Sequence, residues 1–290
     1  MRAASDQTTS WAELHAQTVD RFERAGIDNA VSEARWVVER AAGDPFRVVA
    51  DRPATVRSHH HWRLMVERRE RGEPLQYVLE RWSFRRLEVF LDDRVLIPRP
   101  ETEVVVDAVL DEHRRVGGSV VDLGTGSGVI ALSVAVERPG TEVWGVERSP
   151  DALAVARANC TGLGRRASTV RLVEGSWYDP LPEGLLGAVG VIASNPPYVP
   201  DSAPLPSDVE DWEPVEALRA GDDGLDAIRT IVAGARRWLA PGGALVVEHG
   251  DDQGAAVRSL AHAAGFDTVR TGADLAGRER FLVARGQAER

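Results

Sequence analysis

The first quarter of the chain places its apolar residues three and four positions apart, the spacing that buries one face of an α-helix. Ser10 and Asp28 each precede such a stretch, where the side chain of a helix N-cap belongs. Gly26 and Gly43 lie where these helices would end. The periodic apolar positions are Trp11, Leu14, Val19, Phe22, Ala30, Ala34, Val37, Val38, Leu64 and Val66. The pattern predicts a small helical domain over residues 1–72.

The pattern changes between Leu75 and Ile97. Here aromatic and branched apolar residues are interrupted by charged ones, which is typical of short antiparallel strands. The apolar positions are Tyr77, Val78, Trp82, Phe84, Leu87, Val89, Phe90, Leu91 and Val95. We expect residues 73–98 to form a β-hairpin linker.

Beyond Pro100 the pattern alternates between strand and helix. Strands are predicted over Ser119–Leu123, Glu142–Val146, Val170–Val173, Val189–Ser194, Ala244–Glu248, Thr268–Thr271 and Arg280–Ala284. Helices are predicted over Gly128–Val136, Pro150–Cys160, Leu225–Leu239 and Ala255–Ala264. This alternation predicts an α/β fold with a mostly parallel, doubly wound sheet over residues 99–290. Ligands of such sheets bind beyond the carboxyl ends of the strands.

Composition and charge narrow the possible functions. The formal net charge is −10, and residues beyond 72 contain 34 acidic and 23 basic side chains. Such a surface disfavours nucleic acid as a substrate. No lysine is present, which excludes lysine chemistry, and Cys160 is the single cysteine. The first ten residues carry no apolar signal core, and no apolar stretch approaches the ~20 residues that span a bilayer, so we expect a cytoplasmic protein without membrane contact.

A glycine-rich turn follows the first strand predicted after Pro100. Its candidate ligand-binding residues are Asp122, Gly124, Thr125, Gly126, Ser127 and Gly128. Glycines let the backbone approach a ligand closely, and Glu147, about 20 residues further on, can accept hydrogen bonds from ribose hydroxyls. Together they indicate a nucleoside cofactor, either NAD or S-adenosylmethionine. The GxGxG spacing favours the latter, as does Asp122, which suits the cationic half of its methionine moiety.

A second polar turn follows the strand Val189–Ser194. It reads Asn195-Pro196-Pro197-Tyr198. Two prolines fix two φ angles and remove two N–H groups, leaving nearby carbonyls free to accept hydrogen bonds. If the Asn195 side-chain oxygen and the Pro196 carbonyl each accept a substrate N–H, they orient a planar nitrogen for methylation. Tyr198 would pack on the planar group and exclude water.

The turn from Asn195 to Tyr198 resembles the signature of methyltransferases that act on planar nitrogens. More narrowly, the chain resembles the PrmC/HemK family of peptide chain release factor N5-glutamine methyltransferases. Besides the two turns, the matching segments are Pro74–Tyr77, Leu96–Glu103, Glu213–Pro214, Asp223–Leu225 and Leu239–Gly243, with Glu248 and Gly250. The resemblance implies a seven-stranded Rossmann-like class I methyltransferase domain after a helical domain and a hairpin linker.

The same resemblance implies a role for each matching residue. Gly124 to Gly128 would hold the methionine part of S-adenosylmethionine, Glu147 the ribose and Trp177 the adenine region, with Asn195 also near the cofactor. Asn195, Pro196, Pro197 and Tyr198 would bind the substrate glutamine, and S-adenosylhomocysteine would leave. The family commonly has Asp at position 147 and an acid at position 176, where this chain has Glu and Ser. The segment Ile97–Glu103 indicates only a rigid turn.

The leading hypothesis is therefore methylation of the glutamine in the Gly-Gly-Gln tip of release factors, with no metal involved. The N-terminal helices would recognise the body of the release factor. Three alternatives remain: a ribosomal-protein glutamine as substrate, a nucleic-acid base as substrate, and a catalytically silent nucleoside-binding scaffold. His59, His60 and His61 do not suggest a metal site, because consecutive helix residues point about 100° apart.

Overall fold

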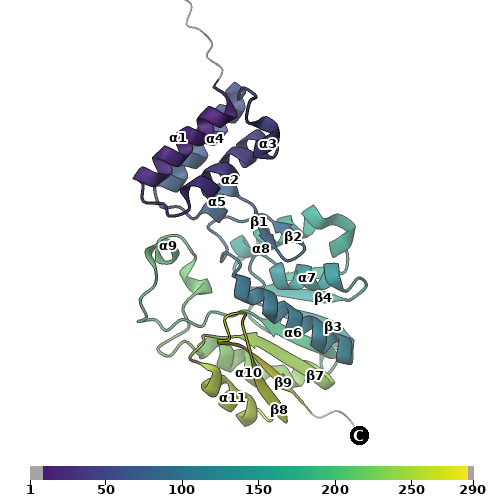
Figure 1. Ribbon diagram of the computed structural model, residues 1–290. Helices are drawn as coiled ribbons and strands as arrows, with labels where there is room; N and C mark the ends of the chain where they lie inside the picture. Colours follow the sequence, from purple (N-terminus) through teal and green to yellow (C-terminus); the bar gives the residue numbers. More distant parts are fainter. Residues whose placement is uncertain (1–8, 287–290) are drawn as a thin grey trace, which may run out of the picture. The chain divides into compact units, whose positions relative to one another are not determined.

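The computed structural model of the protein describes residues 9–286 and divides the chain into two compact units, one ending at Arg81 and the other beginning at Trp82. The first unit is helical, as the apolar spacing predicts (Figure 1). Its helices are α1 (Trp11–Arg24), α2 (Ala30–Ala42), α3 (Phe46–Val49), α4 (Val56–Glu70) and α5 (Leu75–Leu79). Leu14, Phe22 and Trp62 are among the side chains that their apolar faces bury. Burial of these faces holds the unit together.

The helix ends of this unit are predicted in part. Ser10 caps α1 through a reciprocal pair of hydrogen bonds with Glu13, and Gly43 ends α2 at a φ of 78°. The prediction that Asp28 caps α2 is wrong, since Asn29 is the N-cap residue and its side chain makes no capping hydrogen bond. The choice between two adjacent capping residues depends on where the chain turns, which composition does not reveal.

The hairpin is shorter than predicted. Residues 75–79 form the helix α5, and only β1 (Trp82–Phe84) and β2 (Leu87–Val89) pair as antiparallel strands. Four of the five α5 side chains are buried, and a short apolar run of this kind suits a buried helix as well as a strand. The boundary between the two units falls inside the predicted linker, and a separate linker over residues 73–98 remains a prediction.

A seven-stranded sheet in the order β5-β4-β3-β6-β7-β9-β8 forms the centre of the second unit (Figure 1). The strands are β3 (Ser119–Leu123), β4 (Val143–Glu147), β5 (Val170–Glu174), β6 (Val189–Ser194), β7 (Leu239–Glu248), β8 (Thr268–Ala273) and β9 (Glu279–Arg285). Strands β3 to β7 are parallel, and β9 is antiparallel to both its neighbours. The chain returns from β5 to place β6 beside β3, so the switch point of the sheet lies between β3 and β6. The predicted α/β class is confirmed.

Helices cover both faces of this sheet. They are α6 (Pro100–Val116), α7 (Val129–Glu137), α8 (Pro150–Leu163), α9 (Ser207–Glu210), α10 (Asp226–Trp238) and α11 (Gly254–Ala263). Val121 and Leu123 share one buried cluster with α10 and α11, whereas the intervening Asp122 bonds to the backbone of α7 on the opposite face. Sequence analysis missed α6, which begins with Pro100 at its first position and carries acidic residues in its first turn.

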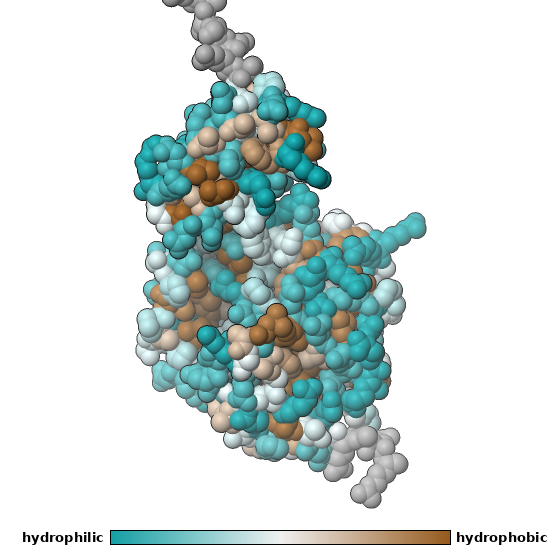
Figure 2. Space-filling model, viewed as in Figure 1, coloured by the Kyte–Doolittle hydropathy of each residue, from teal (hydrophilic) through white to brown (hydrophobic). Residues whose placement is uncertain are grey.

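Exposed apolar side chains are scattered over each unit. The large ones are Val31, Trp36, Val48, Val56 and Leu64 in the first unit, and Val215 and Leu275 in the second. Figure 2 shows apolar areas of limited size among hydrophilic side chains on the face in view. Isolated exposed apolar residues are ordinary and do not mark a functional surface.

Candidate active site

A cavity of about 340 Å³ opens beside the switch point, at the carboxyl ends of β3, β4, β5 and β6. Its volume falls within the ~300–1,000 Å³ typical of small-molecule sites. The predicted site residues that line it are Gly124, Thr125, Gly126, Ser127, Glu147, Trp177, Asn195 and Pro197. Those outside its lining are Asp122, Gly128, Pro196 and Tyr198. The glycine-rich turn and Asn195 thus belong to one site.

The turn between β3 and α7 contains three glycines in left-handed backbone conformations. Their φ angles are 71° at Gly124, 55° at Gly126 and 89° at Gly128, a region that other residues enter at a cost. Gly128 is the N-cap residue of α7, so the first helical turn begins next to this loop, and of its N–H groups that of Ala131 donates to Asp122. Such a helix start favours a ligand's negative or hydrogen-bond-accepting group.

Glu147 ends β4 with its carboxylate facing the cavity. The Gly126 N–H donates to Oε2 at 2.9 Å, and the Ser149 N–H donates to Oε1 at 3.0 Å. Each oxygen keeps acceptor capacity for a ligand hydroxyl. Trp177 lines the same cavity with a φ of 48°, and its Cζ3 lies 3.5 Å from the place of a Cβ on Gly124. The carboxylate and the indole give the site the two features that a nucleoside requires.

Asp122 lies beneath the loop instead of in the cavity lining. Its side chain is fully buried, and its Oδ2 accepts hydrogen bonds from Thr125 Oγ1 at 2.6 Å and from the Ala131 N–H at 3.1 Å. Burial raises the pKa of Asp122 to about 7. In the structure the Oδ2 of Asp122 holds the loop against α7, and the contact of Asp122 with a cationic ligand stays a prediction.

Asn195 follows β6, and within residues 9–286 its side-chain amide forms a hydrogen bond through Nδ2 but none through Oδ1. Its Nδ2 donates to Thr102 Oγ1 at 3.2 Å, and Thr102 Oγ1 donates to Glu248 Oε2 at 2.7 Å. The Asn195 Oδ1 is buried and has no hydrogen-bond partner within residues 9–286. Buried acceptors without a donor are rare in folded proteins, and because Asn195 lines the cavity, this oxygen is a candidate acceptor for a ligand donor.

Tyr198 lies outside the cavity lining, and its packing on the substrate stays a prediction. Its ring packs against the hydrophobic core, and its hydroxyl donates to Glu248 Oε1 at 3.4 Å. Burial raises the pKa of Tyr198, which keeps the phenol protonated as a donor. Gln253 Nε2 donates to the Tyr198 carbonyl at 2.9 Å. Tyr198 therefore anchors the end of the turn that begins at Asn195.

The segment Ile97–Glu103 contacts two buried carboxylates that sequence analysis did not connect with it. The Ile97 N–H donates to Glu213 Oε2 at 3.1 Å, and Thr102 reaches Glu248 as described above. Burial raises the pKa of Glu213. Ile97 and Glu213 are 116 residues apart in the sequence, and Thr102 and Glu248 are 146 residues apart. Pro98 and Thr102 line the cavity, so these two hydrogen bonds hold part of its lining in place.

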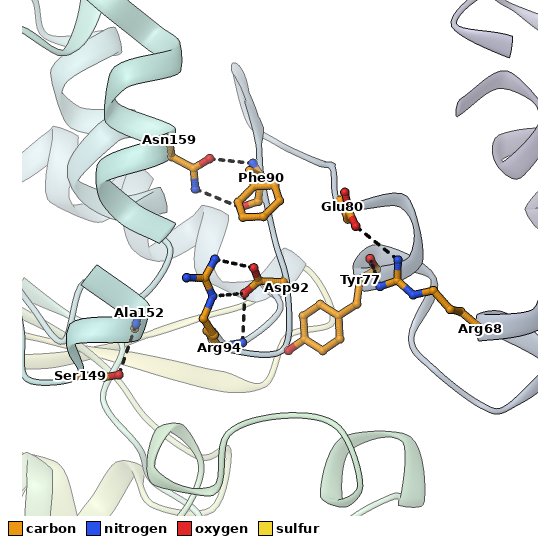
Figure 3. A network of polar contacts seen from close by, with 9 residues as sticks. All are labelled: Arg68, Tyr77, Glu80, Phe90, Asp92, Arg94, Ser149, Ala152 and Asn159. Carbon is orange, nitrogen blue, oxygen red and sulfur yellow. Dashed lines mark hydrogen bonds and ion pairs between the residues drawn. The ribbon is translucent and has the colours of Figure 1, made fainter. Parts of the chain in front are cut away.

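Asn159 on α8 contacts both the segment after the hairpin and the glycine-rich loop, and Figure 3 shows its hydrogen bonds to Phe90. Its Oδ1 accepts from the Phe90 N–H at 2.7 Å, and its Nδ2 donates to the Phe90 carbonyl at 3.1 Å. The same Nδ2 donates to the Ser127 carbonyl at 2.9 Å. One buried amide thus satisfies three backbone groups and fixes the position of Ser127.

Comparison with known proteins identifies relatives of this chain. Residues 13–79 match the PrmC N-terminal domain, and residues 100–206 match the methyltransferase small domain. The release factor glutamine methyltransferase of Burkholderia pseudomallei is 46% identical, over 80% of this chain and 82% of that protein. The one from Caulobacter vibrioides is 39% identical, over 91% and 92%. The chain belongs to the release factor glutamine methyltransferase family.

The resemblance inferred from the motifs is confirmed, and this member of the release factor glutamine methyltransferase family is an S-adenosylmethionine-dependent methyltransferase. The structure of the hMettl16 catalytic domain shares its fold with a TM-score of 0.53 at 14% identity, over 80% of this chain and 82% of that one. Within the described residues, no group of three or more His, Cys, Asp or Glu side chains is arranged to hold a metal. No helix in that part of the chain is long and apolar enough to cross a membrane.

The contacts of Asn159 give a first prediction for this family member. We expect Asn159→Leu to lower the free energy of unfolding by about 2–3 kcal/mol, because buried backbone groups at Phe90 and Ser127 lose their partners. Affinity for S-adenosylhomocysteine should fall about tenfold as the loop loosens. Urea unfolding and calorimetric titration measure the two effects. Thr161→Val, on the same helix but exposed, is the control and should resemble wild type. Wild-type cofactor affinity in Asn159→Leu would contradict the role given to Asn159.

Proposed function

We propose that the protein transfers a methyl group from S-adenosylmethionine to the side-chain N5 of the glutamine in the GGQ motif of a peptide chain release factor. The observation that carries the proposal is the buried Asn195 Oδ1, an acceptor without a donor in a cavity shared with the glycine-rich loop. The names of the relatives favour a glutamine of release factors over other planar nitrogens.

The cavity fits both a nucleoside and an amide. Glu147 would accept hydrogen bonds from ribose hydroxyls, Trp177 would pack on the adenine region, and the loop from Gly124 to Ser127 would hold the methionine part. S-adenosylmethionine, when bound, supplies a methyl group on a positively charged sulfur. The departure of S-adenosylhomocysteine and the lack of any metal requirement belong to the same proposal.

The chemistry requires an amide nitrogen to act as nucleophile although its lone pair is delocalised. Asn195 Oδ1 would accept one N–H of the glutamine and the Pro196 carbonyl the other, with Pro197 lining the cavity beside them. Both bonds would hold the nitrogen in line with the methyl group, which is a large share of catalysis when no strong base is present. The nitrogen would lose a proton to solvent after the N–C bond forms. Tyr198 would act by holding the turn in place.

The partner would be a release factor in the cytoplasm. The N-terminal helices would contact its body, because a three-residue tip offers little specificity. The net charge of −10 opposes phosphate, so no direct contact with nucleic acid is expected. No contact with a membrane is expected either.

The test is incubation of the purified protein with methyl-labelled S-adenosylmethionine and, separately, unmethylated release factor, ribosomal protein and DNA. We expect label on the release factor, located by peptide mass spectrometry at the GGQ glutamine. A release factor with that glutamine changed to alanine is the matched control and should take no label. Label only on ribosomal protein or DNA would support methyl transfer but would show that release factor is not the substrate. Tight cofactor binding without transfer to any acceptor would indicate a silent scaffold.

A further inference from the structure

The catalytic amide of Asn195 is one end of a buried chain of three side chains from separate parts of the second unit. Thr102 lies in the first turn of α6, Asn195 follows β6, and Glu248 ends β7. Thr102 is 1% exposed and Glu248 is 0% exposed, so solvent does not compete for their hydrogen bonds.

We propose that Thr102 and Glu248 are positioning residues that fix which end of the Asn195 amide faces the substrate. A threonine hydroxyl has a single hydrogen to donate. An ionised Glu248 only accepts, so it takes that hydrogen and leaves lone pairs of Thr102 Oγ1 facing Asn195. Only the Nδ2 end of the amide can donate to them, and Oδ1 is turned to the other side. The proposal rests on the proposed function, in which Oδ1 receives a substrate N–H.

The opposite orientation of the Asn195 amide shows why these two positioning residues matter. An asparagine amide rotated by half a turn keeps its shape but exchanges acceptor for donors. Nδ2 would then face the N–H groups of the substrate, and neither side would have a hydrogen-bond partner. A site of this kind loses the acceptor that orients the nucleophile without losing the residue. Thr102 and Glu248 prevent the rotated orientation, because Thr102 Oγ1 can accept a hydrogen bond from Nδ2 and has no hydrogen left to donate to Oδ1.

The first test separates positioning from packing. Thr102→Val keeps the volume of the side chain but removes the hydroxyl, and Thr102→Ser keeps the hydroxyl. We expect Thr102→Val to lower kcat about 30-fold with S-adenosylhomocysteine affinity within twofold of wild type, and Thr102→Ser to restore kcat to within about threefold. Thr161→Val is the matched control, since its exposed hydroxyl donates to the Arg157 carbonyl in the same helix. Equal kcat in Thr102→Val and wild type, or equal loss in Val and Ser, would overturn the proposal.

The second test does not depend on the acceptor. The side-chain amide of Asn195 gives a pair of proton–nitrogen resonances, which are assigned by their absence in Asn195→Asp. We expect its protons to exchange slowly in the wild type and in Thr102→Ser, and at least tenfold faster in Thr102→Val, which has no acceptor for Nδ2. An unchanged rate of proton exchange in Thr102→Val would overturn the proposed hydrogen bond from Asn195 Nδ2 to Thr102. If wild type fails to methylate release factor, the proposed function fails, while this measurement still decides the orientation.

The third test uses the ionisation of Glu248. The groups that face its carboxylate are Thr102 and Glu101 from α6, Tyr198 after β6, and Arg280 from β9. Burial outweighs Arg280 and raises the pKa of Glu248 to about 7. Below that pH a protonated Glu248 can donate to Thr102, whose hydrogen is then free to turn toward Asn195.

We therefore expect kcat to fall about fivefold between about pH 8 and about pH 6 as Glu248 gains a proton. Glu248→Gln, whose amide oxygen accepts at every pH, should show a flat profile over this range with kcat within about tenfold of wild type. The same decline in Glu248→Gln as in wild type would assign the titration elsewhere and overturn the role of Glu248.

Discussion

Replacing Asn195 by alanine is expected to lower the rate of methyl transfer about a thousandfold, because the amide oxygen that we propose to orient the acceptor nitrogen is removed. Cofactor binding should change less than about threefold, since the glycine-rich loop and Glu147 are proposed to hold the nucleoside and make no hydrogen bond to this amide. Single-turnover measurement with labelled S-adenosylmethionine and saturating release factor separates the chemical step from binding.

Asn29→Ala is the matched control for this experiment. Asn29 is exposed at the start of α2, and its side chain makes no capping hydrogen bond, so its truncation should leave the rate unchanged. A rate within tenfold of wild type for Asn195→Ala would show that the buried oxygen does not orient the substrate. A thousandfold weaker binding of S-adenosylhomocysteine would instead place Asn195 in the cofactor site alone.

Parts of the fold follow from sequence because the local signals agree with the tertiary structure. The strands Ser119–Leu123 and Val189–Ser194 are observed with the predicted bounds. Both are short, mostly apolar runs, and each is followed directly by a residue suited to a turn, Gly124 or Asn195. Helix α6 gives a weaker signal, because charged residues interrupt its apolar face and its start at Pro100 reads equally well as a loop.

Some residues of the candidate site are likewise predictable from the sequence, whereas others are not. Residues at the end of a strand or directly after it, such as Glu147 and Asn195, are predictable because the carboxyl ends of parallel strands meet at one edge. The alternation of side chains within a strand turns Asp122 toward α7, which its position next to the loop does not reveal. Thr102 and Glu248 meet only because β7 pairs with β6 and α6 packs on both strands, a contact across 146 residues. Contacts between residues so far apart in the sequence become visible only when the fold is known.

Replacing Gly224 by alanine is expected to lower methyl transfer about a hundredfold through the backbone of the turn from Asn195 to Tyr198. A Cβ on Gly224 would lie 2.3 Å from the Tyr198 carbonyl oxygen and 2.9 Å from Gln253 Nε2. Both distances are too short, so the carbonyl and its hydrogen bond from Gln253 must shift. Because Asn195 lies three residues before Tyr198 in the same rigid turn, its amide moves with them. Kinetics of methyl transfer to release factor measure the loss.

The strain of the left-handed backbone has to be separated from this clash. Gly224 has a φ of 72°, and Gly187 has a φ of 66° in an exposed turn where an added Cβ meets no atom within 4 Å. Alanine at either position costs roughly 1–2 kcal/mol of stability from the backbone alone. Gly187→Ala should therefore lose that stability and keep its rate, while Gly224→Ala loses both. If the two variants have equal rates at equal folded concentration, the close approach of Gly224 to Tyr198 does not position the turn.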